Sequence, residues 1–247
     1  MKICICAIIK NENDYLEEWI EWHLKLGFSE IYLYEDYDSN SHKEITDKYE
    51  NVHLSQVKDV GLVQNNDMRQ QTLYQWFCEN YKDKMDWCAF IDIDEFVILD
   101  GITLEELCSK FNDSEFNAFA LWWKMFNANG CIRKSSKKVM ERFTKSIDNC
   151  LAEASSLFMY KSFINMHKDV LWEHVHKVTK TCDVENNRID YNPKLNKTIY
   201  KYAWINHYFT KSYEEYKLRL KRGNITLGLR HKELFFQLNN DLKDFNN

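Results

Sequence analysis

The sequence predicts an α/β protein: a mostly parallel β-sheet flanked by helices, followed by a helical C-terminal segment. Residues 3–9 form a short, continuous apolar run, which is typical of a parallel strand buried on both faces. Residues 14–26 then place apolar side chains at helical spacing, and this alternation continues through the first half of the chain. Strands that alternate with helices form parallel sheets, because each helix carries the chain back to start the next strand.

Local signals set the expected ends of these elements. Asp14 and Glu17 have the spacing of a capping box at the start of the first helix, and Gly27 is a natural C-cap. Thr103 and Glu106 have the same spacing before a later helix. The expected strands are residues 3–9, 31–34, 52–57, 87–91 and 116–123, and further helices are expected at residues 44–50, 68–81, 213–222 and 232–247.

Composition narrows the class of protein. The net charge of −5 argues against a general nucleic-acid binder, which normally has a strong basic excess. Apolar residues make up 45% of the chain, which is enough for a substantial core. Eight cysteines without a CxxC pair fit a reducing cytosol better than a disulfide scaffold, and no apolar run is long enough to span a bilayer. We therefore expect a soluble cytoplasmic protein, and a peripheral contact with the inner face of the membrane is compatible with this.

Two acids at the end of an apolar run point to chemistry. In the segment Trp87–Phe96, Asp92 and Asp94 are two residues apart, so in a strand both would point to the same face. Two ionised carboxylates side by side need a compensating cation, and hard oxygen ligands suit Mg²⁺ or Mn²⁺ carrying a diphosphate. The alternative is an exposed strand end with solvated acids, which a DxD motif alone does not exclude.

Several separated segments resemble one family of enzymes. The acids Asp92 and Asp94 follow Gln71 and Tyr74, and all the matching segments together span residues 3–223 in the family's order. The chain resembles glycosyltransferases of the GT-A fold, closest to a family 92-like branch near family 2. The other matching segments are Lys10–Glu12 with Leu16, Trp19 and His23; Trp122 or Trp123 with Phe126 and Gly130; Ile205–Tyr208 with Lys211 and Ser212; and Lys221–Gly223.

The resemblance implies a metal-dependent transferase with Mn²⁺ or Mg²⁺ as cofactor. Such an enzyme moves a sugar, most simply a hexose, from a uridine-diphosphate donor to a glycan or lipid-linked acceptor, with inversion, in polysaccharide biosynthesis. It also implies a GT-A catalytic domain at residues 1–205 and a C-terminal segment, residues 206–247, that closes over the donor site. The loop 35–40 departs from the family's usual pattern, and Asn127 stands where a glycine is often found.

The resemblance also assigns roles to single residues. Asp92, Asp94 and His207 are the expected metal ligands, and His174 and His176 compete with His207 because they would share a strand face. The residues expected to contact the donor have plain alternatives as helix caps or as a solvated helix face. They are Asn11, Glu12, Asp36, Arg69, Gln71, Asp92, Lys211 and Arg222.

An inverting transfer needs a carboxylate near the acceptor hydroxyl to act as base. Glu141 is the first candidate and Glu173 the second, with Asp169 also downstream of the metal motif. Glu141 lies in the basic segment 133–145, which we expect to be an exposed loop or lid.

Other functions use similar features. A haloacid-dehalogenase-type phosphatase has a DxD motif near its N-terminus, followed by Thr or Val, whereas here the motif lies at Asp92 and continues with Glu95 and Phe96. A sugar nucleotidyltransferase would need a Gly-rich phosphate loop, and the segment 10–13 has no glycine. A catalytically silent sugar-binding module of the same fold would lack the two acids, and both are present.

Overall fold

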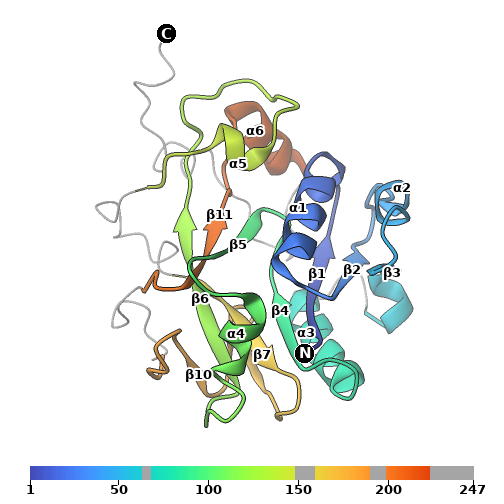
Figure 1. The fold of residues 1–247 in the computed structure, drawn as a ribbon. Helices are drawn as coiled ribbons and strands as arrows, with labels where there is room; N and C mark the ends of the chain where they lie inside the picture. Colours follow the sequence, from blue (N-terminus) through green and yellow to red (C-terminus); the bar gives the residue numbers. More distant parts are fainter. Residues whose placement is uncertain (63–67, 148–158, 190–198, 223–247) are drawn as a thin grey trace.

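One large mixed sheet organises the part of the chain that the structure describes (Figure 1). The computed structural model describes residues 1–62, 68–147, 159–189 and 199–222. The strand order is β3-β2-β1-β4-β7-β6-β11-β5, and β10 pairs with β6. The pairs β1–β2, β2–β3, β1–β4, β6–β10 and β6–β11 are parallel, whereas β4–β7, β6–β7 and β5–β11 are antiparallel. The strands are β1 (Ile3–Ile9), β2 (Glu30–Glu35), β3 (Val52–Gln56), β4 (Trp87–Phe90), β5 (Glu95–Leu99), β6 (Ala118–Met125), β7 (Tyr160–Asn165), β10 (Thr181–Cys182) and β11 (Ala203–His207), with a separate hairpin of β8 (Trp172–His174) and β9 (Lys177–Val178).

Helices cover both faces of this sheet. All seven residues of β1 are buried, and they alternate between two apolar cores. Trp19 and Ile20 of α1 belong to the core on one face, and Leu73 and Phe77 of α3 belong to the other. The helices are α1 (Asn13–Leu26), α2 (Lys43–Thr46), α3 (Arg69–Tyr81), α4 (Leu104–Ser109), α5 (Val139–Arg142) and α6 (Tyr213–Arg222), with a 3₁₀ turn η1 (Val57–Val60). The predicted α/β class with a mostly parallel, helix-flanked sheet is therefore confirmed.

Most predicted elements of the first half are present, with local corrections. Gly27 ends α1 in the left-handed conformation, with φ 106°, as a C-cap should. The capping box predicted from Asp14 and Glu17 is wrong, because α1 begins at Asn13 with Glu12 as its N-cap and no side-chain capping bond. Asp14 instead forms an ion pair with Lys134 at 2.5 Å. The helix predicted at residues 44–50 is only α2, and residues 57–60 form η1 instead of extending β3.

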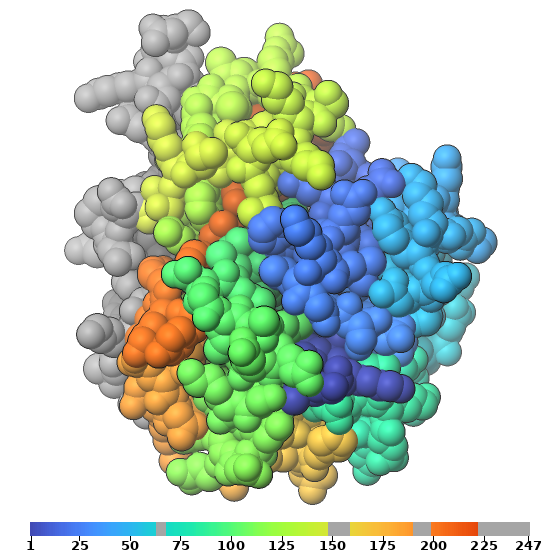
Figure 2. All heavy atoms as spheres, viewed as in Figure 1, coloured from blue at the N-terminus to red at the C-terminus, as the bar shows by residue number. Residues whose placement is uncertain are grey.

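The basic segment 133–145, predicted as an exposed loop or lid, is exposed up to residue 138 and is attached to α1. We call residues 131–142 the strap; it ends in the short helix α5. Figure 2 shows it in yellow-green, lying against the blue surface of α1 at the top of the view. The Glu18 carboxylate accepts hydrogen bonds from the backbone N–H groups of Val139 (2.7 Å) and Met140 (3.3 Å) and so caps α5 from α1. The strap is thus fixed to the core of the fold through α1.

The C-terminal part of the described chain is integral to the sheet. The predicted boundary between residues 205 and 206 falls inside β11, which lies between β5 and β6. The predicted helix at 213–222 is α6, whereas the helix expected at 232–247 lies outside the described residues. None of the helices in the described ranges is long and apolar enough to cross a membrane.

Candidate active site

Three acids lie where β4 passes into β5: Asp92 and Asp94 in the turn, and Glu95 as the first residue of β5. β4 ends at Phe90, so Asp92 and Asp94 lie in a turn and the predicted strand alternation is wrong at this point. The turn is closed by a hydrogen bond from the Glu95 N–H to the Asp92 carbonyl (3.0 Å). The Trp19 indole N–H donates to the carbonyls of Asp92 (3.1 Å) and Glu95 (2.8 Å). The two acids therefore point in different directions from a turn that α1 holds in place.

Asp92 is held by groups from the sheet and from α3. One carboxylate oxygen accepts from Lys161 Nζ (2.7 Å), and the other from the Gln70 side-chain amide (3.0 Å). Lys161 comes from β7, is fully buried, and also lies 3.6 Å from a Glu95 oxygen. Burial lowers the pKa of Lys161, but Asp92 and Glu95 outweigh this and raise the pKa above its usual value. Lys161 is therefore a permanent cation beside Asp92, whose own side chain is 33% exposed.

Asp94 faces the C-terminal part of the chain. Its carboxylate forms an ion pair with Arg219 of α6 and lies 3.6 Å from His207 Nε2. Burial would raise the pKa of Asp94, but the Arg219 guanidinium and His207 hold the pKa well below its usual range. Burial lowers the pKa of His207 despite Asp94, so the imidazole is neutral and able to act as a ligand.

The geometry fits a divalent cation. The register of β11 on β5 places His207 opposite Glu95, and Asp94, Glu95 and His207 offer ligand atoms within 4.8 Å of one another. Within the described part of the chain, Glu95 Oε1 and His207 Nδ1 are buried and have no hydrogen-bond partner. Two carboxylates and a neutral imidazole are suitable ligands for Mn²⁺. Asp94 and His207, two of the three predicted ligands, thus lie in one cluster. The third, Asp92, is bound by Lys161 and Gln70, and the remaining residue of the cluster is Glu95.

A cavity of about 330 Å³ adjoins Arg219. Its walls include the predicted donor contacts Asn11, Glu12 and Lys211. Asn11 has a positive φ of 52°, donates its N–H to Ser39 Oγ (3.1 Å), and accepts from the Asn40 N–H (2.7 Å). The loop after β1 is therefore tied to the loop after β2, which fixes one wall of the cavity.

The other predicted donor contacts lie in different surroundings. Asp36 and Arg69 form a buried ion pair at 3.0 Å, and Lys10 lies 3.7 Å from Asp36. The Gln71 side chain donates to the Trp172 carbonyl (3.0 Å), so its neighbour Gln70 is the residue that reaches Asp92. Arg222 is the last residue of α6, and its side chain lies outside the described residues.

Comparison with known proteins identifies the family. The family model described as "Glycosyltransferase family 92" matches residues 1–243. The chain belongs to glycosyltransferase family 92. A family 92 protein of Ricinus communis is 25% identical over 121 residues, which cover 49% of this chain and 21% of that protein. One of Oryza sativa subsp. japonica is 24% identical over 111 residues, which cover 44% and 18%. The chain thus spans about a fifth of the length of these curated relatives.

Solved structures are more distant. HddC from Yersinia pseudotuberculosis aligns with 88% of this chain and 97% of its own at 10% identity, with a TM-score of 0.40. The mannosyltransferase Ktr4p from S. cerevisiae aligns with 49% of this chain and 39% of its own at 11% identity, with a TM-score of 0.32. Likenesses of this size are too weak to support an inference about function.

The base candidates of this family 92 chain do not contact the acids. Glu141 is exposed on α5, and Glu173 is exposed and pairs with Lys177 at 2.9 Å. Among the described residues, no hydrogen bond or ion pair joins either glutamate to Asp92 or Asp94. Asp169 accepts a hydrogen bond from Asn117 through its backbone carbonyl.

The competing histidines do not share a strand face as predicted, because β8 ends at His174 and His176 lies in the turn that follows. Their rings are 5.2 Å apart, and the His176 ring lies 5.1 Å from Trp123, the same ring that His207 contacts at 4.2 Å.

Four residues of the candidate site were not among the predicted site residues. Glu95, Gln70, Lys161 and Arg219 all contact the acids or lie among them, and only contacts between distant segments bring three of them there. Lys161 had a signal in the sequence: it is the lone charge in the otherwise uncharged strand Tyr160–Asn165. A lysine in a strand that is buried throughout needs a buried acid as partner.

Proposed function

We propose that this chain is a metal-dependent glycosyltransferase that moves a hexose from a uridine-diphosphate donor to a hydroxyl of a glycan or lipid-linked acceptor, with inversion. The observation that carries the proposal is the meeting of Asp94, Glu95 and His207 beside Arg219, which lines the cavity that Asn11, Glu12 and Lys211 also line. A cation site beside a cavity whose lining includes Lys211 and Arg219 suits a nucleoside diphosphate. Membership of glycosyltransferase family 92 supports the reaction class.

Each side chain has a distinct part in this proposal. Mn²⁺ or Mg²⁺ held by Asp94, Glu95 and His207 would neutralise the charge that develops on the leaving diphosphate. Asp92 is partly exposed and fixed by Lys161 and Gln70, so it can accept hydrogen bonds from the donor's sugar or ribose hydroxyls. Lys211 and Arg219, which both line the cavity, supply positive charge to the diphosphate.

The acceptor hydroxyl needs a base, and two glutamates are candidates. Of the two glutamates predicted as base, Glu173 lies on the β8–β9 hairpin, whose His176 contacts Trp123 beside His207. Glu141 lies on α5, on the strap. We therefore favour Glu173 as the base for the acceptor hydroxyl. A cytoplasmic location, which we expect from eight cysteines without a CxxC pair, and a peripheral membrane contact are part of the proposal.

Replacement of Asp94 tests this proposal. Asp94→Asn should abolish sugar transfer and Mn²⁺-dependent binding of uridine diphosphate, because it removes one charged ligand, while the protein stays folded. Calorimetric titration with uridine, adenosine and guanosine diphosphates, with and without Mn²⁺, measures the binding. Asp83→Asn, at an exposed aspartate just beyond α3, is the matched control and should bind like the wild type.

Full activity in excess chelator would contradict the metal dependence. Equal binding of all three nucleotides would contradict the uridine preference.

A further inference from the structure

Arg219 occupies the carboxylate that the proposed cation needs. Its guanidinium pairs with Asp94 Oδ2 and stacks 4.0 Å over the Phe209 ring. The Asp94 side chain is 6% exposed and the Arg219 side chain 20% exposed, so the pair is largely shielded from water. Within the described residues, Arg219 Nε is buried without a hydrogen-bond partner. Asp94 therefore already has a counter-ion that belongs to the protein.

Two cations on one carboxylate repel each other. A divalent ion on Asp94 and a guanidinium on the same group would lie only a few ångströms apart, where like charges in a poorly solvated site interact strongly. Lys161 does not face this conflict, because it holds Asp92 and not Asp94. Binding of the cation therefore requires Arg219 to give up part of its contact with Asp94.

The cavity offers Arg219 a second position. Arg219 lines the cavity together with Lys211, the other basic side chain of the lining, and with the acids Glu12, Asp14 and Glu215. A guanidinium binds phosphate oxygens in a bidentate manner through its planar fork of N–H groups. A diphosphate in this cavity would therefore satisfy the guanidinium after it leaves Asp94.

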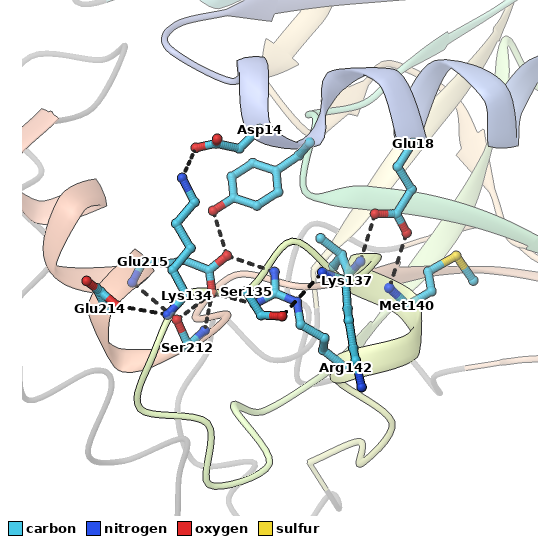
Figure 3. A network of polar contacts seen from close by, with 12 residues as sticks. Asp14, Glu18, Lys134, Ser135, Lys137, Met140, Arg142, Ser212, Glu214 and Glu215 are labelled. Atoms are coloured by element: carbon cyan, nitrogen blue, oxygen red, sulfur yellow. Dashed lines mark hydrogen bonds and ion pairs between the residues drawn. The ribbon is translucent and has the colours of Figure 1, made fainter.

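The first turn of α6 is fixed by a buried cluster that we call the Glu215 hub (Figure 3). The Glu215 carboxylate accepts two hydrogen bonds from Arg142, both at 2.8 Å, one from the Tyr15 hydroxyl at 2.7 Å, and one from the Ser212 N–H at 3.0 Å. Glu215 and Arg142 are 2% and 5% exposed. Because Arg219 lies one helical turn beyond Glu215, its side chain can change position while the helix stays in place.

We propose that Arg219 is an exchangeable counter-ion, which neutralises Asp94 in the free protein and transfers to the donor's diphosphate when cation and donor bind. This rests on the proposed function, since it requires a cation on Asp94 and a diphosphate in the cavity. Arg219 then has two partners in turn, Asp94 and the diphosphate. Removal of its side chain should therefore strengthen the binding of the cation and weaken the binding of the diphosphate.

Arg219→Gln separates the two effects. Mn²⁺ alone should bind roughly threefold to tenfold more tightly, because its competitor is gone. Uridine diphosphate at saturating Mn²⁺ should bind about tenfold or more weakly, because a charge-assisted contact is lost. Arg219→Lys should keep Mn²⁺ affinity near that of the wild type and still weaken the nucleotide, because a lysine lacks the planar fork. Lys217→Gln removes the same charge from an exposed position on the same helix and should change neither.

Calorimetry with Mn²⁺ alone and then with uridine diphosphate gives both constants, and circular dichroism confirms that the variants are folded. A shift of both affinities in the same direction, or no shift in either, would overturn the exchange and leave the proposed function standing. Absence of Mn²⁺-dependent nucleotide binding in the wild type would overturn both.

Discussion

The two aspartates of one turn are neutralised by cations from very different parts of the fold. Lys161 reaches Asp92 from the centre of the sheet, and the lysine side chain is only 1% exposed. Arg219 reaches Asp94 from α6, and its side chain is 20% exposed beside a cavity. One ion pair is therefore part of the sheet, and the other lies at the boundary between the sheet and a helix that packs on it.

The two ion pairs should therefore have different roles, one in the stability of the fold and one in the exchange of partners when a ligand binds. Lys161 itself has no access to solvent, so it cannot leave Asp92 without becoming an unpaired buried cation, which costs several kcal/mol. A pair that borders a cavity can change partners when a ligand enters. We therefore expect the Lys161 pair to be a condition of folding and the Arg219 pair to be a condition of binding.

Replacement of Lys161 should have the largest effect on stability. Lys161→Met leaves Asp92 and Glu95 without their buried cation and should lower the free energy of unfolding by ~3–5 kcal/mol. Arg219→Met should cost less, because it leaves one acid instead of two without its cation, and Asp94 keeps His207 3.6 Å away as a partner. Urea denaturation at pH 7 measures both, with Lys137→Met on the exposed part of the strap as control. Equal losses for Lys161 and Arg219 would remove the distinction between the two pairs.

The Glu215 hub, which holds the helix that carries Arg219, should contribute less to stability at acid pH. Burial raises the pKa of Glu215, but hydrogen bonds from Arg142, Ser212 and Tyr15 outweigh it and lower the pKa from 4.5 to about 2. Because the pKa of Glu215 is lower in the folded protein than in the unfolded chain, its charge stabilises the fold at pH values above 4.5. This stabilisation is lost as the pH falls from 4.5 towards 2. The stability difference between wild type and Glu215→Gln should therefore shrink over this range in urea titrations.

A constant difference between the two proteins from pH 7 down to pH 2.5 would show that the charge of Glu215 is not what the hub uses.

The smallest expected effect is that of a single hub hydroxyl. Tyr15→Phe removes one hydrogen bond to Glu215 and should lower the free energy of unfolding by about 1 kcal/mol. Tyr49→Phe, at a half-buried tyrosine outside the hub, should change it by less than about 0.5 kcal/mol. Thermal unfolding of the two variants measures both changes in stability. If Tyr15→Phe is as mild as Tyr49→Phe, α1 contributes little to holding α6.

The first half of the fold could be predicted because its signals are local. The buried run of β1 and the helical spacing that ends at Gly27 each determine an element without help from distant residues. The turn at Asp92–Asp94 could not be distinguished from a strand, because Ile91 and Ile93 are apolar and buried in either case. Whether the backbone bends there depends on Trp19 of α1, which binds the carbonyls of the turn.

The site was only half predictable for a related reason. Asp94 and His207 were found because their residue types carry the chemistry themselves. Lys161 and Arg219 matter through pairing with an acid 69 and 125 positions away, and nothing in their immediate neighbours specifies that pairing. Gln70 and Gln71 illustrate this most directly. They are neighbours of the same residue type, and only the orientation of α3 about its own axis determines that Gln70 is the one that faces Asp92.

The place of β11 has a consequence for biosynthesis. This strand lies between β6 and β5, and its register brings His207 opposite Glu95. During translation, β6 ends about 80 residues and β5 about 100 residues before β11 begins, so the edge that each presents to β11 stays unpaired until β11 has been made. The carboxylates of the turn acquire the histidine and the arginine only after that delay. A nascent chain that has passed the turn at Asp92–Asp94 is therefore still without His207 and Arg219.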